Sequence, residues 1–172
     1  MTRHHIRTAL TCAVALGALA VATPTVAQAA AGDARERIVI SYLEVNGRES
    51  EGFRAFGPIS GSGVGTQEWL DDRTVTATLP LAGGSVDVTV TIGDEHVDFD
   101  PRACKAVMTW TGTWAVTGGT GAYAAATGAG EAAQAKHIVG ARIGGSCQGP
   151  ESGVEPHLIR VRAVLAGFVN LA

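Results

Sequence analysis

The sequence predicts an all-β domain, either a β-barrel or a β-sandwich. Apolar and polar residues alternate strictly over residues 86–92, so every second side chain would point to the same face of a sheet. The same alternation recurs over residues 106–117 and 157–169, and the chain's 23 glycines supply turns between short segments. We count about seven or eight such segments, and many short strands with Gly-rich turns are typical of sandwiches and barrels. Periodicity alone does not distinguish these two architectures.

The first half of the domain is expected to form a strand, an irregular stretch and a hairpin. Residues 37–45 form the expected first strand, and residues 53–66 are Gly-rich and irregular. Residues 74–79 and 86–92 are expected to pair around a turn at residues 81–84. Pro80 should end the first strand of that hairpin, because proline cannot donate to a β-ladder.

The second half is expected to continue as strands joined by polar or Gly-rich turns. Residues 97–99 lead to a turn at Asp100 and Pro101. Over residues 106–117, one face would carry Met108, Trp110, Gly112, Trp114 and Val116. The other expected segments are a small-residue turn followed by a strand to about residue 143, a polar loop over residues 144–156 and a last strand over residues 157–169.

The first 29 residues are expected to be a secretory signal peptide. Arg3 and Arg7 give a basic start, residues 8–21 are apolar, and Ala27, Gln28 and Ala29 supply a cleavage site for signal peptidase. The apolar run is shorter than the roughly 20 residues that a membrane-spanning helix needs. Residues 30–172 would then form a single β-domain, for which their length is suitable. The expected location is outside the cell.

Charge argues against two classes of partner. The chain has 13 Lys and Arg residues against 16 Asp and Glu residues. Removal of Arg3 and Arg7 with the signal would leave a net charge of about −5, whereas nucleic-acid binding needs a basic face. Lys105 and Lys136 are the only lysines. We therefore expect neither a nucleic-acid partner nor, after signal removal, a membrane partner.

Two of the three cysteines, Cys104 and Cys147, remain after loss of the signal. In an exported chain, such a pair favours one disulfide over two free thiols. Closing a loop of this length contributes roughly 3–4 kcal/mol in the chain-entropy model. No metal ligand is expected, because neither cysteine has a His or Cys neighbour at metal-ligand spacing. No organic cofactor is expected either.

Residues 118–130 have the sequence GGTGAYAAATGAG, which contains a formal G-x-G-x-x-A match. A dinucleotide-binding turn would need a helix after it and a βαβ context. Gly128 and Gly130 interrupt the Ala-rich stretch, and each glycine costs about 1 kcal/mol in a helix interior. The structural alternative is a barrel corner, where glycines allow positive φ and small residues let two backbones approach closely.

The stretch TWTGTWAVTGGTGAYAAATGAGEA, residues 109–132, resembles the strand, GGTG turn, aromatic residue and G-x-G of the allene oxide cyclase-like superfamily, which includes the plant dirigent proteins. The resemblance weakens over residues 39–100. It implies an antiparallel eight-stranded barrel with a central apolar cavity. Several members bind, or act on, small apolar molecules without a metal or organic cofactor. The catalytic positions of that superfamily cannot be matched here, so none is transferred.

The aromatic residues of this region are candidates for ligand binding. Trp110 and Trp114 lie four residues apart on one strand and therefore share a face. If that face points into a cavity, both can stack on a flat ligand, and the alternative is that they fill the core. Tyr123 is a third candidate, either as a hydroxyl donor or as a side chain packed over the Gly-rich corner.

Glu44 is the catalytic candidate among the ionisable residues, because it is in phase with Ile38, Ile40 and Tyr42 on one strand face. A buried acid has a raised pKa and can transfer protons. The alternative is a strand-end carboxylate beside the turn at residues 46–47. Arg160 and Arg162, and also Asp87, are expected to face solvent. The other ionisable residues considered are His96, Asp98 and His137.

These observations lead to one principal functional expectation and two alternatives. We expect a secreted barrel that binds a small apolar molecule. A cofactor-free isomerase or cyclase, which would act mainly by positioning its substrate, is the first alternative. A non-catalytic surface or matrix module is the second. No G-x-S-x-G elbow and no H-E-x-x-H motif is present. The oligomeric state is left open.

Overall fold

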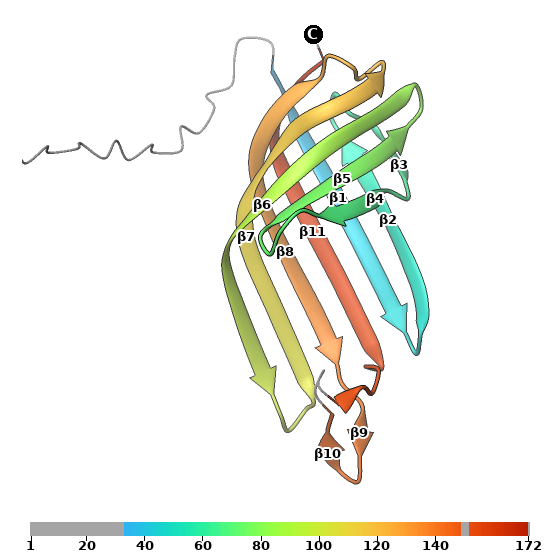
Figure 1. Cartoon of the computed structure of the whole chain (residues 1–172), viewed down its shortest axis with the longest axis vertical. Coiled ribbons are helices and arrows are strands. Elements are labelled where there is room, and N and C mark those ends of the chain that lie inside the picture. The colour runs from blue at the N-terminus through green and yellow to red at the C-terminus, as the bar shows by residue number, and fades with distance from the viewer. Residues whose placement is uncertain (1–32, 149–151, 172) are drawn as a thin grey trace, which may run out of the picture.

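The computed structural model describes residues 33–148 and 152–171. These residues form a strongly curled antiparallel sheet of nine strands, which makes a half-barrel, and a small two-stranded sheet (Figure 1). The strand order in the large sheet is β3-β2-β1-β11-β8-β7-β6-β5-β4. The strands are β1 (Ala34–Val45), β2 (Arg48–Phe56), β3 (Gly61–Gly63), β4 (Thr66–Trp69), β5 (Thr74–Leu81), β6 (Gly84–Asp100), β7 (Lys105–Gly121), β8 (Thr127–Val139), β9 (Arg142–Ile143), β10 (Ser146–Cys147) and β11 (Leu158–Asn170).

Most strands of the large sheet pair with their neighbours in sequence. The exception is β11, which lies between β1 and β8. The β1–β11 ladder extends from the pair Ala34 and Val169 to the pair Val45 and Leu158. This ladder joins the first and last strands of the described domain. The predicted hairpin of residues 74–79 and 86–92 is confirmed by the β5–β6 ladder.

Two details of the first half differ from the prediction. Residues 53–66, expected to be irregular, include the end of β2, all of β3 and the start of β4. Pro80 lies inside β5, opposite Ser85, and does not end the strand. The β4–β5 ladder reaches only to Thr78, so Pro80 lies beyond it, where its missing N–H leaves no gap in that ladder.

The sheet curls until β3 lies against β5 at one end of the molecule. A Cβ atom at Gly65 would lie 2.9 Å from the carbonyl oxygen of Thr78, and one at Gly61 would lie 2.8 Å from Leu81 Cδ2. At Gly65 the close atom belongs to the backbone of β5, so glycine suits this position, whereas at Gly61 it is the end of the Leu81 side chain. The curled sheet is a half-barrel, in which β3 and β4 end the strand order.

Two irregularities in the β6–β7 ladder bend the sheet. The register shifts between Asp87 and Val88 and again between Ile92 and Glu95. Bulges of this kind increase twist and bend the strand that contains them. After the second shift, Glu95 lies opposite Trp110. The inner face of β6 therefore changes from even-numbered to odd-numbered residues.

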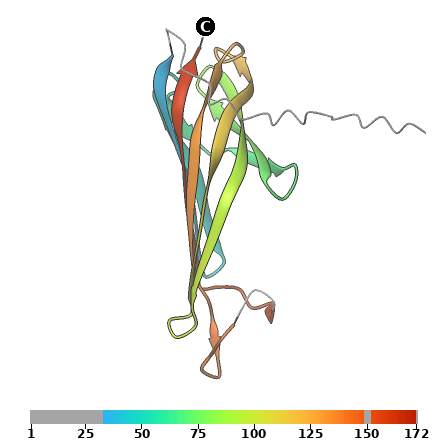
Figure 2. The ribbon, with the colours of Figure 1, turned by 90° about the vertical axis from the view of Figure 1, so that its left-hand side faces the viewer.

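The hydrophobic core fills the curled end of the half-barrel. Trp114, Leu79 and Leu165 are at most 2% exposed there. The other end of the sheet is open, and Figure 2 shows it narrowing to a thin layer. Other members of the core are Ile38, Phe53, Ala55, Ile59, Val86, Val88, Val90, Tyr123, Ala132 and Val169.

The Gly-rich segment, residues 118–130, spans the end of β7, the turn over residues 122–126 and the start of β8, with no helix. Gly121 has φ +57°, and a Cβ atom there would clash with the carbonyl of Gly83. That carbonyl accepts a hydrogen bond from Ala122 N at 2.9 Å. Tyr123 follows, packed into the core with 8% exposure. This strand–turn–strand arrangement matches the predicted corner.

The expected disulfide is present. Cys104 and Cys147 are bonded, with their Cα atoms 5.4 Å apart. The bridge joins the turn between β6 and β7 to the small β9–β10 hairpin at the open end of the sheet (Figure 1). The predicted signal peptide, residues 1–29, lies outside the described residues. Within residues 33–148 and 152–171, no helix has the length and apolarity needed to cross a membrane.

Candidate functional site

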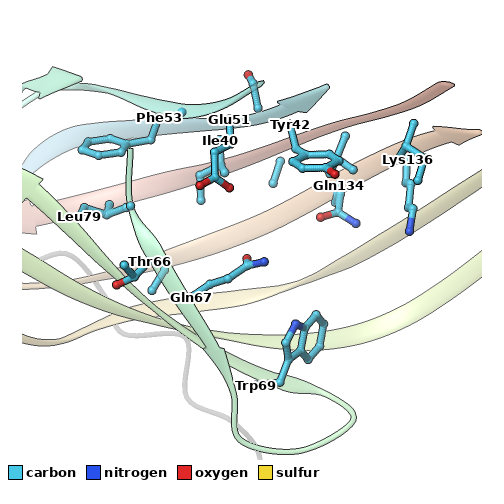
Figure 3. Close-up of a pocket in the computed structure, with 17 residues that line it drawn as sticks. Ile40, Tyr42, Glu51, Phe53, Thr66, Gln67, Trp69, Leu79, Gln134 and Lys136 are labelled. Atoms are coloured by element: carbon cyan, nitrogen blue, oxygen red, sulfur yellow. The ribbon is translucent and has the colours of Figure 1, made fainter. Parts of the chain in front are cut away.

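A cavity of about 510 Å³ opens on the concave face of the sheet (Figure 3). Its floor comes from β1, β2, β8 and β11, and its opposite wall comes from β4 and β5. The lining residues are Ile40, Ser41, Tyr42, Glu51, Gly52, Phe53, Gly65, Thr66, Gln67, Trp69, Ala77, Leu79, Gln134, Lys136, Ile159, Val161 and Ala163.

The floor nearest the core is apolar. Ile40 lies between Phe53 of β2 and Ala163 of β11 in the two ladders of β1. Phe53 is 3% exposed and Ala163 is 7% exposed. Gln134 follows Ala163 on β8 and adds the first polar group to this row. Across β2, β1, β11 and β8, this row of side chains is therefore apolar on the first three strands and ends in an amide on β8.

The next row toward the open end is more polar. Tyr42 lies between Glu51 of β2 and Val161 of β11, and Lys136 of β8 is the partner of Val161. One carboxylate and one ammonium group therefore flank a tyrosine and a valine. Tyr42 and Lys136 are half-buried, whereas Glu51 is exposed.

The wall opposite the floor is formed by β4 and the adjoining part of β5. Figure 3 shows Thr66, Gln67 and Trp69 across the cavity from Phe53 and Tyr42. Trp69 is 56% exposed. The turn that follows β4 projects away from the sheet (Figure 2). This wall leaves the cavity open to solvent beside an exposed indole ring.

Tyr42 is held in a polar contact at the cavity edge. Its hydroxyl donates a hydrogen bond to Glu44 Oε2 at 3.0 Å. Burial raises the pKa of Tyr42, and the nearby carboxylates of Glu44 and Glu49 raise it further. The phenol therefore keeps its proton and acts as a hydrogen-bond donor at neutral pH.

Glu36 is a buried carboxylate that was not among the predicted site residues. It is 3% exposed, and its Oε2 accepts a hydrogen bond from Ile59 N at 2.8 Å. Burial raises the pKa of Glu36, while hydrogen bonds from the backbone of Ile59, Arg37 and Phe56 oppose that rise. The sequence observation that pointed to Glu44, an acid on the same strand face as apolar residues, applies equally to Glu36. Glu36 is in phase with Ile38 on β1.

The three aromatic candidates lie outside the set of cavity-lining residues. Trp114 is 2% exposed in the core, where its Nε1 donates to the carbonyl of Ala166 at 3.3 Å. Tyr123 is in the core as well. Trp110 is half-buried, packs against the core and pairs with Gln134 of the cavity floor. Of the three candidates, Trp110 is therefore the one that pairs with a residue of the cavity floor.

The remaining ionisable candidates do not gather into one site. Glu44 is half-buried beside Tyr42, and its cross-strand partner is Glu49. Arg160 and Arg162 are exposed, as expected. Asp87 is half-buried, unlike the expectation, because it accepts a hydrogen bond from Thr78 Oγ1 at 2.7 Å. His96, Asp98 and His137 are exposed.

In the part of the chain that the structure describes, no three His, Cys, Asp or Glu side chains gather as a metal site requires. Comparison of the chain with protein-family models, curated proteins and solved structures found no match.

Proposed function

We propose that the protein binds a small, largely apolar molecule in the cavity on the concave face of its sheet. The observation that supports this proposal is the cavity of about 510 Å³ beside the core. Binding sites for small molecules are typically concave, mostly apolar and about 300–1,000 Å³ in volume. The cavity fits that description in size and lining.

The arrangement of the lining favours an amphipathic ligand. Phe53, Leu79 and Ala163 offer hydrocarbon at the deep end. Tyr42, Gln134 and Lys136 offer polar atoms toward the open end. A ligand bound in this way buries its apolar part against the core and keeps its polar groups beside amide, phenol and ammonium groups. Such convergent polar groups fix the orientation of a ligand and provide specificity.

The test is native mass spectrometry on protein purified from its own host, compared with the denatured mass. We expect a bound species of a few hundred daltons that denaturation releases intact. An Ala163→Phe variant, which places a ring in the cavity floor, should lose the bound species. A variant with the same change at Ala135, which pairs with Arg162 on the other face of the sheet, is the control and should keep it.

Either of two results would overturn the binding proposal. One is a wild-type protein that remains empty in native spectra and takes up nothing from an extract of its host. The other is an Ala163→Phe variant that retains the ligand at the wild-type level although the new ring occupies the cavity.

A second candidate function is the cofactor-free isomerase or cyclase. The specific observation in its favour is the hydrogen bond from the Tyr42 hydroxyl to Glu44 at the cavity edge. A protonated phenol beside a carboxylate can donate a proton or hydrogen bond to a bound oxygen. Turnover of the extracted ligand by the wild type and its loss in Tyr42→Phe would support catalysis. Unchanged ligand after long incubation would leave binding alone.

We further infer kinship with the allene oxide cyclase-like barrels, whose closed form has eight strands. The strand–GGTG–aromatic turn and the approach of β3 to β5 support this inference. Secretion through residues 1–29 belongs to the same proposal, and a disulfide between Cys104 and Cys147 is compatible with it. An experimental structure and N-terminal sequencing of the exported protein test these two points.

A further inference from the structure

The lower part of β6 is an open sheet edge. The β5–β6 ladder ends at the pair Thr74 and Thr91. Over residues 94–100, β7 is the only strand that pairs with β6 in the described part of the chain. Figure 1 shows this segment as the outermost strand of the sheet at its open end. All seven residues are exposed, so their free backbone groups are accessible to another chain.

The two faces of this edge differ in chemistry. Val97 and Phe99 lie on the concave face, opposite Met108 and Ala106 of β7, and are 53% and 54% exposed. His96 and Asp98 lie on the other face. The edge therefore presents alternating apolar and polar side chains, the pattern that a pairing strand with its own apolar face complements.

The charge of the edge selects among partners. Four of its seven residues are acidic: Asp94, Glu95, Asp98 and Asp100. Charged edges disfavour pairing between copies of a chain, because like charges then oppose one another. The other free edge at this end of the sheet, residues 48–52 of β2, carries two acids, Glu49 and Glu51, and one base, Arg48, so it is acidic as well. A second copy therefore offers a poor match to the β6 edge, and a basic strand offers a good one.

We propose that residues 94–100 of β6 are a docking edge for an extended basic segment of another protein, which adds to the sheet as a further strand. Main-chain hydrogen bonds give affinity in strand addition, and alternate side chains give specificity. Apolar residues of the partner pack on Val97 and Phe99. Its Lys or Arg residues, at the alternate positions, face Asp98 and Asp100. This site is separate from the cavity and does not depend on the proposed ligand.

The test uses the full protein and an acetylated, amidated peptide of alternating lysine and valine, labelled with a fluorophore and followed by fluorescence anisotropy. A second peptide of the same sequence carries N-methyl groups on the alternate residues whose N–H groups would face β6. Loss of those hydrogen bonds should weaken binding at least about tenfold. Purely electrostatic attraction would treat the two peptides alike.

A pair of charge variants locates the site. Asp98→Asn with Asp100→Asn should weaken binding of the unmethylated peptide about tenfold, since two facing charges are lost. Glu131→Gln with Glu155→Gln removes the same charge at exposed positions elsewhere and should leave the affinity unchanged. Hydrogen exchange should show new protection of residues 94–100 when the peptide is added.

Three results would overturn the proposal. The wild type shows no binding to the lysine–valine peptide, or the N-methylated peptide binds as tightly as the unmethylated one. The third result is that the Glu131→Gln, Glu155→Gln control loses as much affinity for the peptide as the Asp98→Asn, Asp100→Asn variant. Any of these results would contradict strand addition at residues 94–100.

Discussion

The carboxylate of Glu36 accepts a hydrogen bond from the backbone N–H of Ile59, 23 residues further along the chain, at 2.8 Å. This contact joins β1 to the loop between β2 and β3 at the curled end of the sheet. The loop packs tightly there, because a Cβ atom at Gly57 would lie 2.7 Å from Glu36 Oε2. Glu36 therefore fixes the loop over residues 57–60, which leads into β3. This loop lies on the core side of the cavity.

Replacing Glu36 with alanine should destabilise the protein by about 1–3 kcal/mol, because the buried N–H of Ile59 then lacks its acceptor. Urea unfolding followed by tryptophan fluorescence measures the change. Glu68→Ala, at an exposed position on β4, is the control and should change stability by less than about 0.5 kcal/mol. Equal effects of the two substitutions would contradict a structural role for Glu36.

The pH dependence of stability provides a separate prediction for Glu36. Burial raises its pKa in the folded state. Its contribution is therefore complete below the unfolded pKa of about 4.3 and is lost as pH rises through the folded pKa. Relative to a Glu36→Gln variant, the free energy of unfolding of the wild type should fall as pH rises from 4 toward 7. The size of this fall is set by the difference between the folded and unfolded pKa of Glu36. Parallel stability curves for the two proteins would contradict this prediction.

Tyr42 should titrate late in alkaline solution. Burial and the carboxylates of Glu44 and Glu49 raise its pKa, so ionisation of this phenol should require a pH above the usual tyrosine range. The absorbance of tyrosinate follows this step, and Tyr42→Phe identifies it between the chain's two tyrosines. Glu44→Gln should lower the pKa of Tyr42, because a negative charge is removed. An unchanged titration in Glu44→Gln would exclude the contact as a cause.

Much of the fold follows from two-residue periodicity. The strands β7 and β11 were predicted because one face of each carries apolar residues at most alternate positions, whereas the sequence left open which face of β7 points inward. The short strands β3 and β4 were missed, because three and four residues carry too little pattern. The bulge after Ile92 was also not predicted, because the register of a strand depends on the facing strand and not on its local sequence.

The cavity was harder to predict than the fold. Its floor and wall come from six strands that are distant in sequence, and Tyr42, Trp69 and Lys136 share no local motif. The position of the curled end decides which aromatic residues fill the core. Trp114 lies there, whereas the same alternation leaves Trp110 half-buried toward the open end. Alternation identifies the face of a side chain but not its position between the curled end and the open end of the half-barrel.

Trp114 and Trp69 should have opposite roles in stability and ligand binding. Trp114 is 2% exposed, so Trp114→Ala should cost about 3–5 kcal/mol through lost packing. Trp69 is 56% exposed and lines the cavity, so Trp69→Ala should cost about 0.5 kcal/mol or less and reduce ligand occupancy. Urea unfolding and native mass spectrometry measure the two effects. A large loss of stability in Trp69→Ala would show that the β4 wall belongs to the core.

Removal of the disulfide should lower the stability of the whole sheet, and not only that of the β9–β10 hairpin. Cys104 and Cys147 are 43 residues apart in sequence, and the loop between them contains β7 and β8. In the chain-entropy model, opening a loop of that size costs about 4 kcal/mol, because the unfolded chain gains freedom. A double Cys104→Ser and Cys147→Ser variant, compared with the oxidised wild type in urea, measures this cost. If the loss is confined to faster hydrogen exchange in β9 and β10, with unchanged global unfolding, the bridge fixes only that hairpin.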